Sequence, residues 1–397
     1  MEDRSSFTAW QTSTRAQLAA MLGLPTVRVP LDSEARGSVE HDGMTVEKWV
    51  LTSEAGSRMP AVVFRPKEPP EERMPGVVVT FGHGGSKSQP DYAYCAQVFA
   101  KLGFVCLMID PIGEEERHAQ GKLGTRAHDP ECVHERALAA GRLIMGKLVW
   151  DTMRGVDFML QRADVDPARV GVAGNSLGGA KAGWMAALDT RLRFAVVSGW
   201  AFAPMLEKCG KFCTRVPNIR MREFLTWPEY LSLAAPHCAV RILNGDADVI
   251  IDSDGRGETW RDTDCAVASA RERWTDAGRP GGLTQWYERG GGHRHYEVRK
   301  PNVEWLVREL RPAGCTEARA HDLPEINFGD WCRVHGVELE RLYGTPLHLL
   351  GATVIDLGLT PVRQHRMAVL RPEELGKPEF TIEGWLDRIS SPERPRT

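Results

Sequence analysis

The sequence predicts an α/β fold with a mostly parallel sheet and helices on both faces. Short, continuous apolar segments rich in β-branched residues recur along the chain, as expected for strands that are covered on both faces. Segments of helical length stand between them, so strand and helix alternate. The strands are expected at 76–81, 104–110, 169–174, 193–199 and 238–245, and the helices at 91–102, 134–163, 177–188 and 258–277.

The N-terminal part has a different pattern. Residues 7–23 carry apolar residues at helical spacing, which predicts a helix. Residues 36–65 contain alternating apolar positions between turn residues, which is typical of strands with one buried face. We therefore expect an N-terminal helical segment over 1–35 and the main α/β domain over 36–312.

The C-terminal part, residues 313–397, breaks the alternation. A linker is expected over 311–325, helices around 328–343 and 380–389, and an apolar segment at 347–358 between them. This part is too poor in strands to extend the main sheet, so we interpret it as an appendage. Three roles stay open for it: covering the site, forming the contact of a homo-oligomer, or bracing the edge of the sheet.

Composition excludes several classes of protein. The 397 residues carry a formal charge of −3 without a basic stripe, which argues against a nucleic-acid partner. No apolar segment approaches the ~20 residues that cross a membrane, and a signal peptide is not recognisable, so a cytoplasmic location is expected. The nine cysteines lack paired metal-ligand spacing, since Cys209 and Cys213 have no second pair. We expect reduced cysteines, no metal and no organic cofactor.

Ser176 lies in a G-x-S-x-G motif between the strand predicted at 169–174 and the helix predicted at 177–188. A nucleophilic serine occupies a sharp strand-to-helix turn of this kind, and small neighbours make room for that turn. The helix N-terminus directs free N–H groups toward the serine. We therefore expect Ser176 to be a nucleophile, with the Leu177 N–H as one oxyanion donor.

A serine nucleophile needs a base, and the base needs an acid that orients it. On a fold of this type the chain order is serine, acid, histidine. Asp246 and Asp248 follow the strand at 238–245, and the pattern favours Asp248 because the turn itself needs a residue at position 246. Asp252 and Asp254 are more distant alternatives.

Two histidines compete for the role of base. His293 and His295 both follow a predicted strand and come after the acid in the chain. Glycines 290–292 leave an open approach to the first of them, which favours His293. His83 precedes the nucleophile, so we expect it to support its loop rather than to act as the base.

The second oxyanion donor is expected from the loop after an earlier strand. His83, Gly84 and Gly85 follow the strand at 76–81, and glycine allows a backbone N–H to turn into the site. We favour the N–H of Gly85, with that of Gly84 as the alternative.

Four stretches together resemble the α/β-hydrolase superfamily, and within it the acetyl xylan esterases, cephalosporin-C deacetylases and dienelactone hydrolases. They are FGHGGSK, MIDPIGEEER, GVAGNSLGGAKAGWMAALD and LNGDADVIID followed by GGGH, and the likeness covers about residues 36–312. Asp110, Gly113 and Arg117 match a loop pattern of these esterases, whereas Glu115 stands where a second glycine is usual. The resemblance implies the α/β-hydrolase fold.

The resemblance also implies a small cap or lid insert at residues 200–236. This segment contains Trp200, Phe202, Phe212, Phe224, Trp227 and Tyr230. Its aromatic residues either line a wall over the site or pack the insert onto the core.

The function expected from these residues is a serine hydrolase that cleaves a carboxylic ester of small acyl type through an acyl-enzyme. Its triad is Ser176, Asp248 and His293, and its partner is a small-molecule ester. Three other reactions use the same triad: acyl transfer, peptide hydrolysis and carbon–carbon bond hydrolysis. A binding protein without activity on this scaffold is the alternative from a different class.

Overall fold

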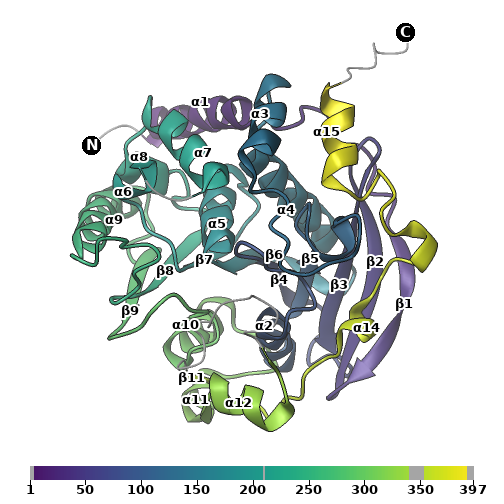
Figure 1. Cartoon of the computed structure of the whole chain (residues 1–397). Coiled ribbons are helices and arrows are strands. Elements are labelled where there is room, and N and C mark those ends of the chain that lie inside the picture. Colours follow the sequence, from purple (N-terminus) through teal and green to yellow (C-terminus); the bar gives the residue numbers. More distant parts are fainter. Residues whose placement is uncertain (1–3, 209–210, 339–352, 391–397) are drawn as a thin grey trace.

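The computed structural model describes residues 4–208, 211–338 and 353–390, and its centre is a nine-stranded sheet (Figure 1). The strand order is β1-β2-β3-β5-β4-β6-β7-β8-β9. The bounds are β1 Glu34–His41, β2 Met44–Glu54, β3 Ser57–Pro66, β4 Met74–Thr80, β5 Val105–Ile109, β6 Val165–Asn175, β7 Phe194–Ser198, β8 Ala239–Gly245 and β9 Leu283–Glu288. The six neighbouring strands β5, β4, β6, β7, β8 and β9 are parallel to one another. At one edge of the sheet, β1, β2 and β3 pair antiparallel, and β3 also pairs antiparallel with β5.

The helices cover both faces of this sheet, as predicted. Their bounds are α1 Arg4–Leu22, α2 Pro90–Lys101, α3 Glu131–Ala139, α4 Ile144–Gln161, α5 Leu177–Leu188, α6 Met205–Lys208, α7 Phe212–Arg222, α8 Trp227–Ser232, α9 Glu258–Asp276, α10 Lys300–Leu310, α11 Glu317–Asp322, α12 Phe328–His335, α14 Gln364–Met367 and α15 Ile382–Ser390. Helices α4, α5 and α9 contribute to one apolar core, and α2 and α10 contribute to the other. The mixed α/β fold with a mostly parallel sheet is therefore confirmed.

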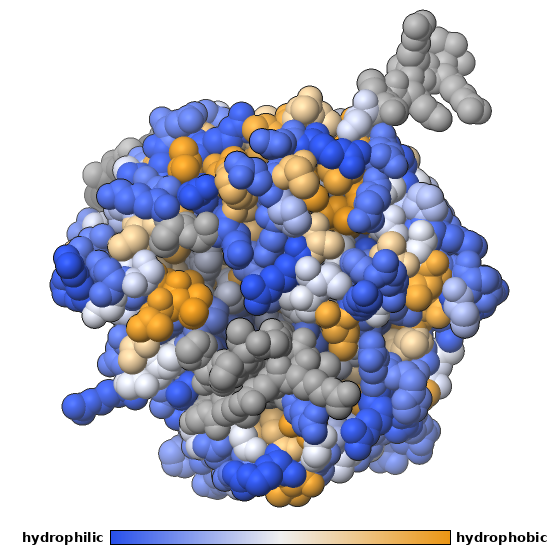
Figure 2. Space-filling model, in the orientation of Figure 1, coloured by the Kyte–Doolittle hydropathy of each residue, from blue (hydrophilic) through white to orange (hydrophobic). Residues whose placement is uncertain are grey.

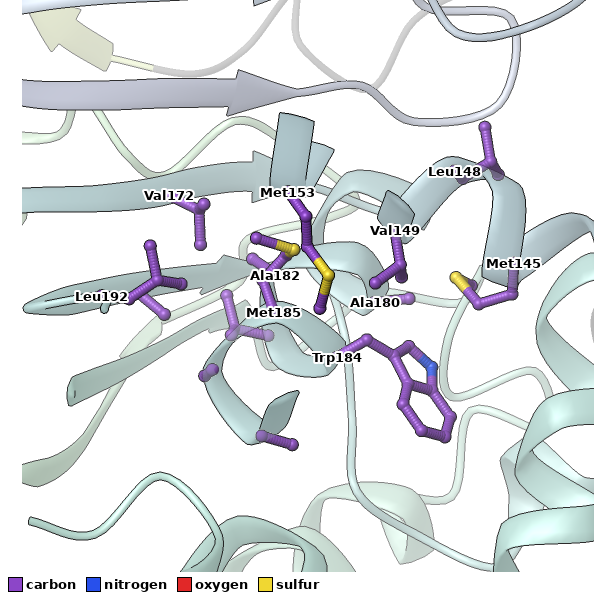
Figure 3. Close-up of a cluster of buried hydrophobic side chains, with 14 of the residues drawn as sticks. Met145, Leu148, Val149, Met153, Val172, Ala180, Ala182, Trp184, Met185 and Leu192 are labelled. Atoms are coloured by element: carbon purple, nitrogen blue, oxygen red, sulfur yellow. The ribbon is translucent and has the colours of Figure 1, made fainter. Parts of the chain in front are cut away.

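The packing of α4 and α5 on β6 anchors the helix that follows Ser176. Met153 of α4 and Met185 of α5 meet over Val172 of β6 (Figure 3). All three side chains are at most 5% exposed. Burying aliphatic side chains stabilises the fold by roughly 1.5–3 kcal/mol each. This core fixes where α5 begins, and therefore where the turn before it lies.

Two expected elements differ from the structure. The helix predicted at 134–163 is two helices, α3 and α4, because Gly141 adopts a φ of +71° between them. A left-handed residue cannot continue a right-handed helix. The linker predicted at 311–325 contains α11, whose first turn is capped by the Thr316 side chain.

The appendage packs on the main domain along its described length. The helix predicted at 328–343 ends at His335, and the residues from 339 to 352 lie outside the described ones. The apolar segment contributes β11 (Thr353–Ile355), which pairs with β10 (Glu325–Asn327) in a separate small sheet. Near the end of the chain, α15 packs against α3 and buries Trp385. These contacts agree with bracing, one of the three roles that the sequence leaves open, and the role stays a prediction.

The part of the surface that Figure 2 colours by hydropathy is mostly hydrophilic. Hydrophobic side chains there form separate small groups among hydrophilic ones. Of the helices that the structure describes, none combines the length and the apolar character that crossing a bilayer requires.

Candidate active site

Ser176 sits on the turn between β6 and α5, where the backbone is strained. Its φ and ψ are 62° and −123°, outside the regions that side-chain-bearing residues normally adopt. Holding such a residue costs of order 1–3 kcal/mol, and residues of this kind cluster at functional sites. The residue is half-buried.

The two glycines of the motif allow the turn to approach β4. A Cβ on Gly174 would lie 2.1 Å from the Thr80 side-chain oxygen, and one on Gly178 would lie 2.3 Å from the Thr80 carbonyl oxygen. Both distances are far below van der Waals contact, so no other residue fits without displacing β4. The close packing inferred from the G-x-S-x-G spacing is present here.

Asp248 and His293 form a hydrogen-bonded pair on the loops after β8 and β9. The Asp248 Oδ2 atom lies 2.7 Å from His293 Nδ1, and the Asp248 Oδ1 atom accepts the N–H groups of Ile250 and Ile251 at 2.9 and 3.2 Å. Asp248 is 1% exposed, whereas 13% of the His293 side chain is exposed. A buried carboxylate that is fully hydrogen-bonded can hold an imidazole in one orientation and one tautomer.

The imidazole of His293 lies beside the nucleophile turn. The position that a Cβ on Gly199 would occupy is 3.1 Å from His293 Cε1 and 3.3 Å from the backbone nitrogen of Ser176. Because Nδ1 faces Asp248, the nitrogen left for the serine hydroxyl is Nε2, which adjoins Cε1 in the ring. The structure thus brings together the serine, the histidine and the aspartate that the sequence favours.

The other acidic candidates have different partners. Asp246 accepts the N–H of Gly290 at 2.6 Å and links the loops after β8 and β9. Asp252 accepts two backbone N–H groups around the start of α9. Asp254 accepts a backbone N–H in its own turn. Each of these carboxylates therefore shapes a loop.

His295 points into the protein. Its Nε2 lies 3.1 Å from Asp91 Oδ2, its ring meets the ring of Tyr92 edge-on at 4.3 Å, and the residue is 4% exposed. This histidine is therefore paired with buried acidic side chains, Asp91 and Glu297.

The loop after β4 corrects the expectation for Gly85. Its N–H donates to the Gly82 carbonyl oxygen at 3.0 Å and closes a turn, in which Gly84 has a φ of +74°. The donor is thus already engaged. The N–H groups of the two central residues of the turn, His83 and Gly84, do not take part in this closing bond. Tyr92 holds the loop, since its hydroxyl oxygen accepts the Gly82 N–H at 2.6 Å.

The His83 side chain points to the cap insert. Its Nε2 lies 2.8 Å from the sulfur of Cys213 on α7 and 3.4 Å from Asp129 Oδ1. Burial raises the pKa of Asp129 to about 6 and lowers the pKa of the neighbouring His128 to about 3. The sequence did not reveal this cluster, because its members come from three distant segments.

The loop in which Glu115 replaces a glycine is held by ion pairs. Glu115 keeps the left-handed backbone that glycine favours, with a φ of 45°. Its carboxylate lies 3.1 Å from the ammonium nitrogen of Lys87, which also faces Asp110 at 2.6 Å and Glu116 at 2.7 Å. Lys87, Asp110 and Glu115 are buried. The resemblance could not predict this pairing, and we assign the loop a structural role.

Replacing Lys87 with methionine is expected to lower the free energy of unfolding by about 3–5 kcal/mol, because it leaves buried carboxylates without their cation. The urea midpoint measures the change. Lys67→Met is the matched control, since Lys67 pairs with Glu40 at the surface and such pairs contribute about 1 kcal/mol or less. Equal midpoints for the two variants would contradict the structural role.

Lys181 is a buried lysine on α5. Burial lowers its pKa to about 7, and the residue is 3% exposed. Its Nζ lies 5.9 Å from the centre of the Phe81 ring. Since the unfolded chain keeps the ordinary Lys pKa near 10.5, the unfolded state binds more protons between pH 7 and 10.5.

Stability of the wild type should therefore rise with pH in this window. Lys181→Met is expected to stabilise the protein by roughly 2–4 kcal/mol at pH 7, and this gain should shrink at pH 9. Urea midpoints of both proteins at the two pH values test it. If Lys181→Met stabilised the protein equally at pH 7 and pH 9, this would contradict the lowered pKa of Lys181.

The insert predicted at 200–236 forms α6, α7 and α8 between β7 and β8. Its aromatic residues Trp200, Phe202, Trp227 and Tyr230 are at most 7% exposed and belong to the core on the α5 face. Tyr230 packs edge-on against Trp184 of α5 at 5.1 Å. Of the two alternatives for these aromatics, packing onto the core agrees with the structure.

Part of the chain is similar to known hydrolases. Residues 32–208 match the family model of acetyl xylan esterases. A Bacillus subtilis protein named as a hydrolase, YtaP, is 31% identical over 193 residues, which are 46% of this chain and 62% of that protein. The chain thus covers less than two thirds of this relative's length.

Solved structures of esterases share the fold. An acetyl xylan esterase-like protein of Bacteroides fragilis has a TM-score of 0.56 and 15% identity, over 72% of this chain and 76% of its own. A glucuronoyl esterase of Solibacter usitatus has a TM-score of 0.55 and 15% identity, over 77% and 93%. A methylesterase has a TM-score of 0.56 and 16% identity, over 95% and 77%. The chain therefore has the α/β-hydrolase fold, and its resemblance to acetyl xylan esterases is confirmed over residues 32–208.

Proposed function

We propose that this protein is a serine hydrolase of carboxylic esters. The observation that carries the proposal is the Asp248–His293 pair at 2.7 Å, set beside the strained turn of Ser176. Nucleophile, base and orienting acid in this arrangement are the requirements of acyl transfer to serine. The matching family and the esterases that share the fold support the same reaction class.

In the first step, the Ser176 hydroxyl oxygen attacks the ester carbonyl carbon and its proton passes to His293 Nε2. Asp248 holds the ring and stabilises the imidazolium that forms. The negative oxygen of the tetrahedral intermediate accepts the Leu177 N–H at the start of α5. The loop after β4 supplies the second donor through the N–H of His83 or Gly84. His293 then returns the proton to the leaving alcohol.

In the second step, His293 removes a proton from water, and the resulting nucleophile attacks the acyl-Ser176 carbonyl. The tetrahedral intermediate uses the same oxyanion donors, and its collapse breaks the bond to the serine oxygen. His293 returns the proton to that oxygen, which frees the carboxylic acid.

Small acyl esters, with acetyl first, are the substrate class that we propose. Support comes from the acetyl xylan esterase model over residues 32–208. Rates on p-nitrophenyl esters of increasing acyl length test it: we expect kcat/KM to be highest for acetate and to fall with chain length. Equal or rising rates for long acyl groups would contradict the substrate class while leaving the nucleophile in place.

Partition of the acyl group between water and an added alcohol or amine tests hydrolysis against acyl transfer. We expect the free acid to be the main product. A main product carrying the added nucleophile would instead make the protein an acyltransferase that uses the same first step.

A further inference from the structure

A second cluster of reactive side chains lies next to the candidate active site. His83 Nε2, one carboxylate oxygen of Asp129 and Cys213 Sγ all lie within 4.8 Å of one another. They come from the loop after β4, the loop before α3 and helix α7 of the insert. The proposed esterase mechanism uses none of these side-chain atoms.

The cluster contains buried polar atoms with unused lone pairs. Among the described residues, neither carboxylate oxygen of Asp129 forms a hydrogen bond, although only 10% of its side chain is exposed. The same holds for Nε2 of His128, which is fully buried 3.4 Å from Asp129 Oδ1. Buried polar atoms of this kind are normally satisfied by a partner. The two unsatisfied carboxylate oxygens, beside the imidazole of His83 and the thiol of Cys213, provide acceptors for a cation.

The histidine next to the cluster, His128, is oriented by a backbone carbonyl. His128 Nδ1 lies 3.2 Å from the carbonyl oxygen of Ile112, which accepts a hydrogen bond from the Nδ1–H group. This hydrogen bond fixes the tautomer in which Nε2 carries the lone pair. His128 thus borders Asp129 at 3.4 Å but lies outside the three-residue cluster.

We propose that His83, Asp129 and Cys213 bind a zinc ion, whose fourth tetrahedral position is left to a water molecule. Imidazole, thiolate and carboxylate are the ligands that zinc takes in proteins. The Cys213 thiolate and the Asp129 carboxylate balance the two positive charges of the ion, so the zinc complex adds no net charge to the buried cluster. Cu²⁺ and Ni²⁺ prefer flatter arrangements of nitrogen and oxygen ligands.

The distances fit this ion after a small adjustment. Tetrahedral zinc with bonds of about 2.0–2.1 Å separates nitrogen and oxygen ligands by about 3.4 Å. His83 Nε2 lies 3.4 Å from Asp129 Oδ1. His83 Nε2 and Cys213 Sγ are 2.8 Å apart, and zinc would widen this contact to about 3.6 Å, since its bond to sulfur is near 2.3 Å.

Bound zinc would cross-link the insert to the loop beside the nucleophile. Cys213 lies on α7, whereas His83 lies in the turn next to Ser176, whose Cβ is 3.1 Å from the position of a Cβ on Gly82. The ion would thus stabilise the insert on the core and fix the loop that carries the second oxyanion donor. This role is independent of whether the protein hydrolyses esters.

Cobalt and zinc titrations of the full chain test the site without an activity assay. Cobalt replaces zinc in such sites, and a thiolate bound to it absorbs in the near ultraviolet. After removal of metal with a chelator, we expect one equivalent of Co²⁺ to produce this absorption and one equivalent of Zn²⁺ to abolish it. We also expect Zn²⁺ to raise the thermal midpoint of the wild type.

Three variants make the test specific. Cys213→Ser should abolish the thiolate band, and Asp129→Asn should weaken Zn²⁺ binding by about 100-fold or more. Cys132→Ser is the matched control, because Cys132 is an exposed cysteine outside the cluster, and it should bind like the wild type. If Cys213→Ser does not fold, the Zn²⁺ affinity of Asp129→Asn tests the proposal by itself. Wild type without a thiolate band, or Asp129→Asn with unchanged Zn²⁺ affinity, would overturn the proposal.

Discussion

Ser176→Ala is expected to reduce kcat for p-nitrophenyl acetate by about 10⁴–10⁶-fold, because the variant lacks the atom that forms the acyl-enzyme. The thermal midpoint should not fall, since alanine removes only a half-buried hydroxyl from a strained turn. Kinetics and a thermal melt of the same preparation measure both.

The control for this variant is Ser253→Ala, which changes an exposed serine. It should retain the wild-type rate. A Ser176→Ala protein that is folded and turns over the ester at more than about a tenth of the wild-type rate would remove Ser176 from the mechanism.

Asp248→Asn is expected to reduce kcat by about 10⁴-fold. The asparagine amide retains the size of the carboxylate, but its NH₂ group would face His293 Nδ1 and select the tautomer whose Nε2 carries the proton. That nitrogen could not accept the serine proton. The variant should remain folded, because the amide oxygen can still accept the N–H groups of Ile250 and Ile251.

Asp246→Asn is the matched control, because it makes the same change two residues earlier. The Asp246 carboxylate accepts a loop N–H at 2.6 Å and does not face the imidazole, so we expect less than about a tenfold loss. A larger loss in Asp246→Asn than in Asp248→Asn would reverse the assignment of the acid.

The nucleophile turn was predictable because its signal is local. Glycines at positions 174 and 178, an apolar strand before them and an apolar helix after them are all contained in one short stretch around Ser176. The tight contacts of both glycines with Thr80 give the physical reason for this pattern. The strands of the parallel sheet were predictable for the same kind of reason, since burial on both faces leaves continuous apolar segments.

What could not be predicted depends on contacts between distant segments. The turn that engages the Gly85 N–H arises from the conformation of Gly84 and from the hydroxyl of Tyr92, which binds the Gly82 N–H. Lys87 finds its partners in Glu115 and two other carboxylates of a loop that follows the next strand. Periodicity and motif spacing do not report such pairs.

The cluster of His83, Asp129 and Cys213 illustrates the same limit most clearly. Cysteine spacing alone argues against a metal, because it tests only ligands that are close in the chain. The fold brings a histidine, an aspartate and a cysteine from three segments to within 4.8 Å. A ligand set of this kind is visible only in three dimensions.

Labelling with a fluorophosphonate followed by mass spectrometry tests the central claim most directly. The reagent forms a covalent bond only with an activated serine, so it reports the nucleophile without requiring the natural substrate. We predict one adduct per chain on the peptide that contains Ser176, no adduct in Ser176→Ala and much slower labelling in Asp248→Asn. An unlabelled wild type, or an adduct on another residue that persists in Ser176→Ala, would contradict the account.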